Sequence, residues 1–140
     1  MIVGYTTGVF DLFHVGHLNV LKAARALCDK LIVGVTTDEL AIEYKKKKPV
    51  VPFMERIEII KSIKCVDLAV RREVYDKHKE WRKLKFDILF VGDDWYGTDN
   101  WNHYEAELSL EGVKVIYLPH TPGTSSTELK KKLEAESNGL

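Results

Sequence analysis

GVFDLFHVGH, residues 8–17, separates two segments of different character and is called here the histidine junction. Before it, residues 1–6 are mostly apolar or β-branched, which predicts a first strand. After it, residues 18–27 carry Leu and Ala at helical spacing, which predicts a helix. His14 and His17 therefore lie where a strand leads into a helix N-terminus. Free N–H groups and the positive end of the helix dipole make such a junction suitable for binding an anion.

The next strand supports a parallel arrangement. Residues 30–36, KLIVGVT, are mainly apolar, which predicts a buried strand and completes a βαβ unit with parallel strands. Strands and helices continue to alternate to the end of the chain. The expected helices are 52–64, 73–84, 103–110 and 128–134, and the expected strands are 67–70, 87–91 and 113–118. We therefore expect an α/β, Rossmann-like, doubly wound fold with a mainly five-stranded parallel sheet.

Composition places limits on domain number and on partners. The chain has 140 residues, 45% of them hydrophobic, which suits one domain with a buried core. We expect that domain to span residues 1–134, with residues 135–140 as a frayed C-terminal tail. Lys plus Arg and Asp plus Glu each number 21, and the resulting zero net charge argues against a nucleic-acid binder.

The cysteines and the N-terminus predict a cytoplasmic protein. Cys28 and Cys65 do not form a CxxC pair, which favours reduced thiols over a disulfide or a metal site. The N-terminus enters a strand directly, without the basic and apolar segments of a signal peptide. No apolar run approaches the roughly 20 residues that span a bilayer, so we expect no membrane insertion.

Polar clusters follow several of the expected strands. Asp38 and the lysine segment, residues 45–48, come after the second strand, and Pro49 and Pro52 indicate a loop there. Gly92–Trp95 follows the fourth strand, and the hydroxyl-rich turn 120–127 follows the fifth. Parallel strands bring these ends to one edge of the sheet, where backbone N–H groups, hydroxyls, lysines and imidazoles suit a nucleoside triphosphate.

Other phosphate and metal motifs are missing from the sequence. Neither a P-loop nor a Gly-x-Gly-x-x-Gly motif occurs, which disfavours kinases, ordinary NTPases and dehydrogenases. A zinc site at His14 and His17 is also disfavoured, because helical metal pairs prefer a spacing of four residues and no third ligand is nearby in sequence.

The same residues resemble a known family. His14-Val15-Gly16-His17, with Gly8, Phe10 and Asp11 before it, resembles the signature of the His-x-Gly-His nucleotidyltransferase superfamily. The match covers Tyr5 to about Lys132 and is closest to the glycerol-3-phosphate cytidylyltransferase branch, of which Gly92–Trp95 is typical. Residues 120–127 are similar to the second signature of the family. Glu55-Arg56, Lys64 and Val66-Asp67 resemble its middle segment, which is partly a dimer interface, and this implies a homodimer.

That resemblance implies a cytidylyltransferase, in which a small phosphorylated alcohol attacks CTP to give a CDP-alcohol and pyrophosphate. It implies that His14 and His17 stabilise the transition state and that Lys45 and Lys47 contact the triphosphate. Magnesium would be bound through the triphosphate, without an identified protein ligand. The implied nucleotide-binding residues are Gly8, Val9, Phe10, Asp11, Gly16, Arg56, Asp94, Trp95, Gly123, Ser125, Ser126 and Thr127. Asp38 and His120 are the implied acceptor-binding residues.

Three departures from the family pattern leave the acceptor open. His120 stands where the second signature has arginine, which is a permanent bidentate phosphate clamp. Val9 replaces a small hydroxyl residue, and Ser126 replaces threonine. The alternatives are an acceptor such as phosphocholine or a phosphonate, and an adenylyltransferase of the same fold acting on a sugar phosphate or a flavin. A non-catalytic nucleotide-binding or assembly module is a third alternative.

Overall fold

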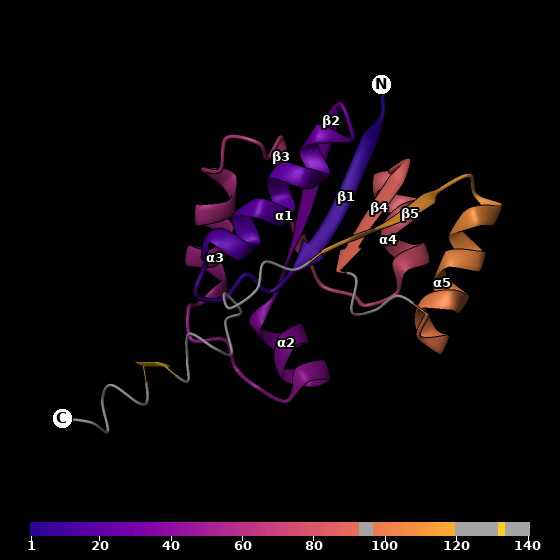
Figure 1. Ribbon diagram of the computed structural model, residues 1–140. Coiled ribbons are helices and arrows are strands. Elements are labelled where there is room, and N and C mark those ends of the chain that lie inside the picture. Colours follow the sequence, from indigo (N-terminus) through magenta and orange to yellow (C-terminus); the bar gives the residue numbers. More distant parts are fainter. Residues whose placement is uncertain (93–96, 120–131, 134–140) are drawn as a thin grey trace.

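Five parallel strands form one sheet in the order β3-β2-β1-β4-β5, in a computed structural model that describes residues 1–92, 97–119 and 132–133 (Figure 1). The strands are β1 Val3–Gly8, β2 Lys30–Thr36, β3 Leu68–Arg72, β4 Ile88–Gly92 and β5 Lys114–Leu118. The expected α/β fold with a five-stranded parallel sheet is therefore confirmed.

Helices cover both faces of the sheet, as in a doubly wound fold. They are α1 Val15–Ala26, α2 Asp38–Lys45, α3 Phe53–Lys61, α4 Lys77–Leu84 and α5 Asp99–Leu110. Side chains of α1 and α3 pack in one buried cluster, whereas those of α4 and α5 pack in the other. The remaining helix, α2, lies beyond the carboxyl ends of the strands (Figure 1). Of the described helices, none is long and apolar enough to cross a membrane.

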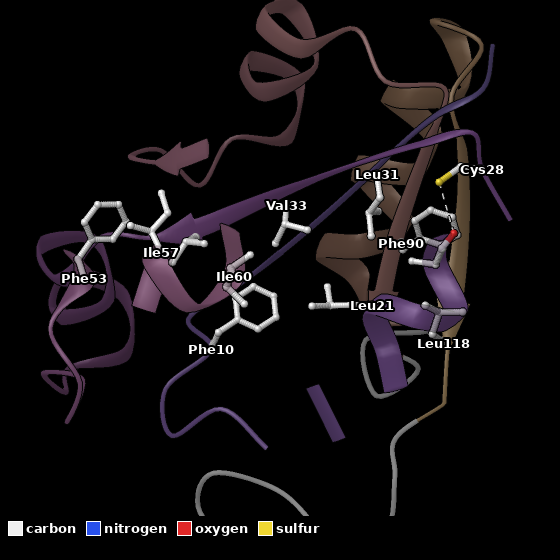
Figure 2. Close-up of a cluster of buried hydrophobic side chains, with 12 residues drawn as sticks. Phe10, Leu21, Cys28, Leu31, Val33, Phe53, Ile57, Ile60, Phe90 and Leu118 are labelled. Atoms are coloured by element: carbon white, nitrogen blue, oxygen red, sulfur yellow. Dashed lines mark hydrogen bonds between the residues drawn. The ribbon is translucent and has the colours of Figure 1, made fainter. Parts of the chain in front are cut away.

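The strands contribute alternate side chains to the two clusters. Leu31 and Val33 of β2 belong to the cluster under α1 and α3, and Ile32 between them belongs to the other. Figure 2 shows the first cluster, in which Phe10 and Ile60 gather with these side chains. Phe10 comes from the histidine junction, so the core and the junction are packed together.

Local capping explains why several helix starts differ from those expected. The first helix begins at Val15 instead of residue 18, because His14 acts as its N-cap. No helix was predicted for residues 38–45, and there Thr37 Oγ1 accepts from Leu40 N–H and starts α2. The expected helix 73–84 begins only at Lys77, where the Asp76 carboxylate caps it. The expected helix 103–110 begins four residues earlier, at Asp99, as the first residue of α5.

Aspartates fix the edge of the sheet where the strands begin. Each precedes a strand and accepts a hydrogen bond from a backbone N–H within one residue of the start of a neighbouring strand, which supports the strand register. The pairs are Asp29 with Ile2 N–H at 2.7 Å, Asp67 with Leu31 N–H at 2.7 Å, and Asp87 with Val3 N–H at 2.8 Å. The opposite edge of the sheet is thereby left to carry other polar groups.

Gly34 in the middle of β2 provides a test of the packing. A Cβ there would collide with the Tyr5 hydroxyl, which is buried and donates to Glu80 Oε1 at 2.9 Å. Gly34→Ala is expected to lower the free energy of unfolding by about 1–3 kcal/mol, the usual cost of overpacking. In a Tyr5→Phe background the cost should be smaller, because the clashing oxygen is gone. Urea denaturation of the four proteins measures both costs, and equal costs would contradict the packing explanation.

Candidate active site

The carboxyl end of β1 is the point where the sheet changes direction. From β1 the chain moves outward through β2 to β3, and then returns to the other side of β1 with β4 and β5. Gly8 pairs with Val35 of β2, and Thr6 pairs with Phe90 of β4. Ligands of open α/β sheets bind in the crevice at such a switch point. The histidine junction begins at this position.

His14 and His17 form a capping arrangement at the start of α1. The Gly16 N–H donates to His14 Nδ1 at 3.0 Å, and the His14 N–H donates to His17 Nδ1 at 3.3 Å. The two rings stack with their centroids 4.0 Å apart. Histidines here take the parts that Ser or Thr and Glu or Gln take in an ordinary capping box. Both imidazoles are therefore fixed by the helix N-terminus.

These hydrogen bonds determine where the imidazole protons lie. Each Nδ1 accepts a hydrogen bond, so the neutral ring carries its proton on Nε2. Burial lowers the pKa of His17 to about 4, assisted by the neighbouring His14 and opposed by Asp11. Burial also lowers the pKa of His14. His14 Nε2 is buried and has no hydrogen-bond partner among the described residues, so it is a donor available to an anion.

The backbone of the junction is held in an unusual shape. The backbone φ angles of Phe10 and Leu12 are 54° and 50°. They lie in the left-handed region, which residues other than glycine rarely adopt. The Phe10 ring is buried and meets the His17 ring edge-on, with centroids 5.5 Å apart. A Cβ at Gly8 would approach the Phe10 ring to 3.0 Å. Gly8 and Phe10 thus shape the turn that presents the histidines.

Three residues expected to contact substrates, Asp11, Asp38 and Arg56, make hydrogen bonds within the protein. Arg56 is 1% exposed, and its guanidinium donates to backbone carbonyls, among them that of Val9, and to Asp38. The Asp11 carboxylate accepts from two backbone N–H groups. The predicted contact between Arg56 and the nucleotide stays a prediction. The bonds to buried carbonyls are a further role of this side chain, and such carbonyls leave no pattern in the sequence.

The lysine segment reaches the same edge of the sheet through α2. Lys45 is the last residue of α2, and Lys47 follows one residue later. Lys46 between them has a left-handed backbone and ends the helix, with its N–H bonded to Ile42 O. All four lysine side chains are exposed. The segment therefore presents positive charge to solvent beyond the carboxyl ends of the strands (Figure 1).

Lys77 is a buried lysine at this edge, and it was not among the site residues predicted from the sequence. Its Nζ donates to Thr7 Oγ1 at 3.2 Å, one residue before Gly8, and pairs with Glu80 at 3.3 Å. Desolvation and the nearby Arg72 lower the pKa of Lys77 to about 7, and Glu80 opposes this. Lys77 is the first residue of the helix that follows β3. This position near the sheet edge was the only feature of the sequence that could have indicated a role for Lys77 in the site.

A cavity of about 350 Å³ opens between β3 and α4, and Glu80, the ion-pair partner of Lys77, lines it. Tyr5, Arg72 and Glu80 are among its lining residues. None of the residues expected to bind substrate lines it, so this cavity is separate from the histidine junction.

Further predicted site residues lie outside the described part of the chain, and they stay predictions. They are Asp94, Trp95, His120, Gly123, Ser125, Ser126 and Thr127, and most of the expected helix 128–134 lies there as well. Within residues 1–92, 97–119 and 132–133, no group of three or more His, Cys, Asp or Glu is arranged to hold a metal ion.

The protonation of the histidines can be observed directly. Long-range ¹H–¹⁵N NMR spectra at pH 7 are expected to give the neutral Nε2–H form for His14 and His17, and His17 should titrate with a pKa of about 4. The pKa of His17 is 6.5 in the unfolded chain and about 4 in the folded protein, so the unfolded chain binds the proton more tightly. Through this residue, the free energy of unfolding should therefore decrease as pH falls from 6.5 towards 4. The exposed ring of His103 provides a solvent-accessible comparison. An Nδ1–H form, or titration of His17 near 6.5, would contradict the capping geometry.

Comparison with known proteins identifies the family. The family model described as "Cytidylyltransferase-like" matches residues 5–132. A glycerol-3-phosphate cytidylyltransferase of Bacillus spizizenii is 36% identical over 129 residues, which are 91% of this chain and 94% of that protein. An FAD synthase of Methanothrix thermoacetophila is 40% identical over 107 residues, 76% of this chain and 72% of that protein.

A solved structure has the same fold. The lipopolysaccharide core biosynthesis protein of Thermoplasma volcanium superposes with a TM-score of 0.72 at 30% identity, covering 86% of this chain and 97% of that one. The resemblance seen in the sequence is confirmed by these matches. The chain therefore belongs to the cytidylyltransferase-like family and is a nucleotidyltransferase.

Proposed function

We propose that the enzyme transfers a cytidylyl group from CTP to sn-glycerol 3-phosphate, giving CDP-glycerol and pyrophosphate. The observation that supports this most is the pair of stacked, neutral imidazoles at the N-terminus of α1, one of which has an unpartnered buried Nε2. Glycerol-3-phosphate cytidylyltransferases are among the relatives that match 91% of the chain, and they supply the choice of base and acceptor.

The reaction needs electrostatic stabilisation and no covalent intermediate. A phosphate oxygen of the acceptor attacks the α-phosphorus of CTP in line, and the bond from that phosphorus to the oxygen of pyrophosphate breaks. The electron pair of this bond leaves with pyrophosphate, so the histidines need not give up their protons. Neutral Nε2–H groups of His14 and His17 would donate to the α-phosphate oxygens and the leaving oxygen as negative charge develops there.

The remaining contacts would be divided along the sheet edge. Lys45 and Lys47 would bind the triphosphate through their exposed ammonium groups. Gly123, Ser125, Ser126 and Thr127 would bind phosphates from the last turn, and Asp94 and Trp95 would lie near the nucleotide. Lys77 and His120 would lie near the acceptor, where the Nζ of Lys77, which donates to Thr7, would be a hydrogen-bond donor for a phosphate. Asp38 would contribute through its bond to Arg56.

Magnesium belongs to this proposal as a partner of the triphosphate. The Asp11 carboxylate of the junction and the Asp38 carboxylate at the start of α2 already accept hydrogen bonds from N–H donors. These residues fit a cation held mainly by phosphate oxygens and water, which is the usual mode for Mg²⁺. When bound, the ion would neutralise phosphate charge.

The proposal also includes the organisation of the chain. The catalytic domain would span residues 1–134, and two copies would form a homodimer. A cytoplasmic location agrees with the free thiols of Cys28 and Cys65. Residues 135–140 would form a C-terminal tail.

Adenylyl transfer is the second candidate, and the match to an FAD synthase favours it. A thermal-shift series with CTP, ATP, GTP and UTP in the presence of Mg²⁺ separates the two candidates. We expect CTP to raise the melting temperature most, since the bound nucleotide stabilises the folded state. Stabilisation by ATP alone would reject cytidylyl transfer.

The acceptor is identified by pyrophosphate release. With CTP, sn-glycerol 3-phosphate is expected to give faster release than phosphocholine or 2-aminoethylphosphonate at equal concentration. Faster release with one of the other two would change the acceptor and keep the reaction. An absence of release with all three would favour a non-catalytic binding module.

The histidines provide the mutational test. His14→Ala and His17→Ala are each expected to lower kcat at least roughly a hundredfold, the scale of losing one donor to a developing charge. His103→Ala is the matched control, because that ring is exposed on α5. Turnover near that of the wild type in both variants would show that the imidazoles are not the transition-state donors.

A further inference from the structure

We propose that Arg56 is a positioning residue, which holds the lysine segment against the histidine junction. The inference deepens the proposed function and rests on it, because the lysines matter only if they contact a triphosphate. The observations that carry it are the hydrogen bonds of a buried guanidinium and of the carboxylates beside it.

The Arg56 guanidinium connects four parts of the chain. It belongs to α3 but makes its bonds to other segments, with nearly no exposed surface. Its acceptors are Val51 O at 2.8 Å, Val9 O at 2.7 Å, Thr36 O at 2.7 Å and Asp38 Oδ1 at 2.6 Å. One side chain therefore ties the histidine junction, the end of β2, the start of α2 and the segment before α3.

Asp38 and Asp11 complete the connection. The second oxygen of Asp38 accepts from Phe53 N–H at 3.3 Å, which joins the start of α2 to the start of α3. Asp11 in the junction accepts from Val50 N–H at 2.8 Å and from Val51 N–H at 2.9 Å. The peptide groups around Val51 are thus held from both sides, by an arginine donor and an aspartate acceptor.

These bonds fix both ends of the path that carries the lysines. Its first end is the start of α2, where Thr36 and Asp38 bind Arg56. Its second end is Val50 and Val51, which bind Asp11 and Arg56. The exposed lysine segment lies between these anchors. Displacement of either anchor would move the lysines relative to His14 and His17.

The choice of arginine supports a geometric role over a purely stabilising one. A buried charge is costly, and apolar residues often replace buried ion pairs without loss of stability. A planar guanidinium has five donors in fixed directions, which suits acceptors that lie on different segments. Lysine at this position would keep a positive charge near Asp38 but would lose the fixed directions of the guanidinium donors.

Amide hydrogen exchange tests the link without any substrate. In Arg56→Lys, and in Asp11→Asn, exchange of the Val50 and Val51 amides is expected to become about tenfold faster or more, the effect of weakening one hydrogen bond. The matched control is Arg25→Lys on α1. Arg25 also binds a backbone carbonyl and a carboxylate, those of Cys28 and Asp67, but has no bond to this path. Unchanged exchange in both test variants would overturn the proposal.

Kinetics test whether the link serves the reaction. Arg56→Lys is expected to lower kcat/KM for CTP at least roughly tenfold, since a misplacement of about 1 Å can cost on the order of a hundredfold. The effect of removing Lys45 and Lys47 together should be smaller in the Arg56→Lys background, and it should be undiminished in the Arg25→Lys background. A purely structural arginine would leave the lysine effect equal in both, and that result would overturn the proposal.

Failure of the proposed function can be distinguished from failure of the positioning role of Arg56. In that case the wild-type protein transfers no cytidylyl group, while faster Val50 and Val51 exchange in the two test variants still supports the link. An intact reaction with kinetics unaffected by Arg56→Lys would instead reject the positioning role and keep the proposed function.

Discussion

The parallel pairing of β1 with both β2 and β4 is the constraint on which the rest of the structure depends. It makes β1 the central strand and brings every carboxyl end to one edge. The aspartates that precede strands hold the opposite edge. The two edges of the sheet therefore have different roles. Loops at the carboxyl edge can supply the site residues, while hydrogen bonds at the opposite edge support the strand register.

The histidine junction illustrates how closely the site depends on the backbone. His14 and His17 cap α1 through Nδ1, and that same use of Nδ1 leaves the proton on Nε2. Capping, protonation and ring orientation thus have one cause. The turn that makes this possible has left-handed residues at Phe10 and Leu12. It is held by the buried Phe10 ring, by the Arg56 guanidinium, which donates to Val9 O, and by the Val50 N–H, which donates to Asp11. Positioning of the imidazoles is therefore a property of several packed segments.

Sequence patterns predicted the sheet because strand and helix periodicities are properties of the side chains themselves. They predicted less of the connections. His14 is an uncommon N-cap, so the expected start of α1 was three residues late. The internal hydrogen bonds of Arg56 could not be predicted. Its partners, the carbonyls of Val9, Thr36 and Val51, are groups that every residue has, so they leave no mark in a sequence. Lys77 lies in a charged helix, KHKEWRKL, whose composition indicates a surface and gives no sign of burial.

The burial of Lys77 has a consequence for proton uptake. Glu80 lies between two cations, Arg72 and Lys77, so the buried group carries one excess positive charge when Lys77 is protonated. With its pKa lowered to about 7 from 10.5, Lys77 is neutral in the folded protein and charged in the unfolded chain between these values. Unfolding in that range takes up a proton, and through this residue stability rises with pH. The heat of unfolding at alkaline pH therefore includes the ionisation heat of the buffer that supplies the proton.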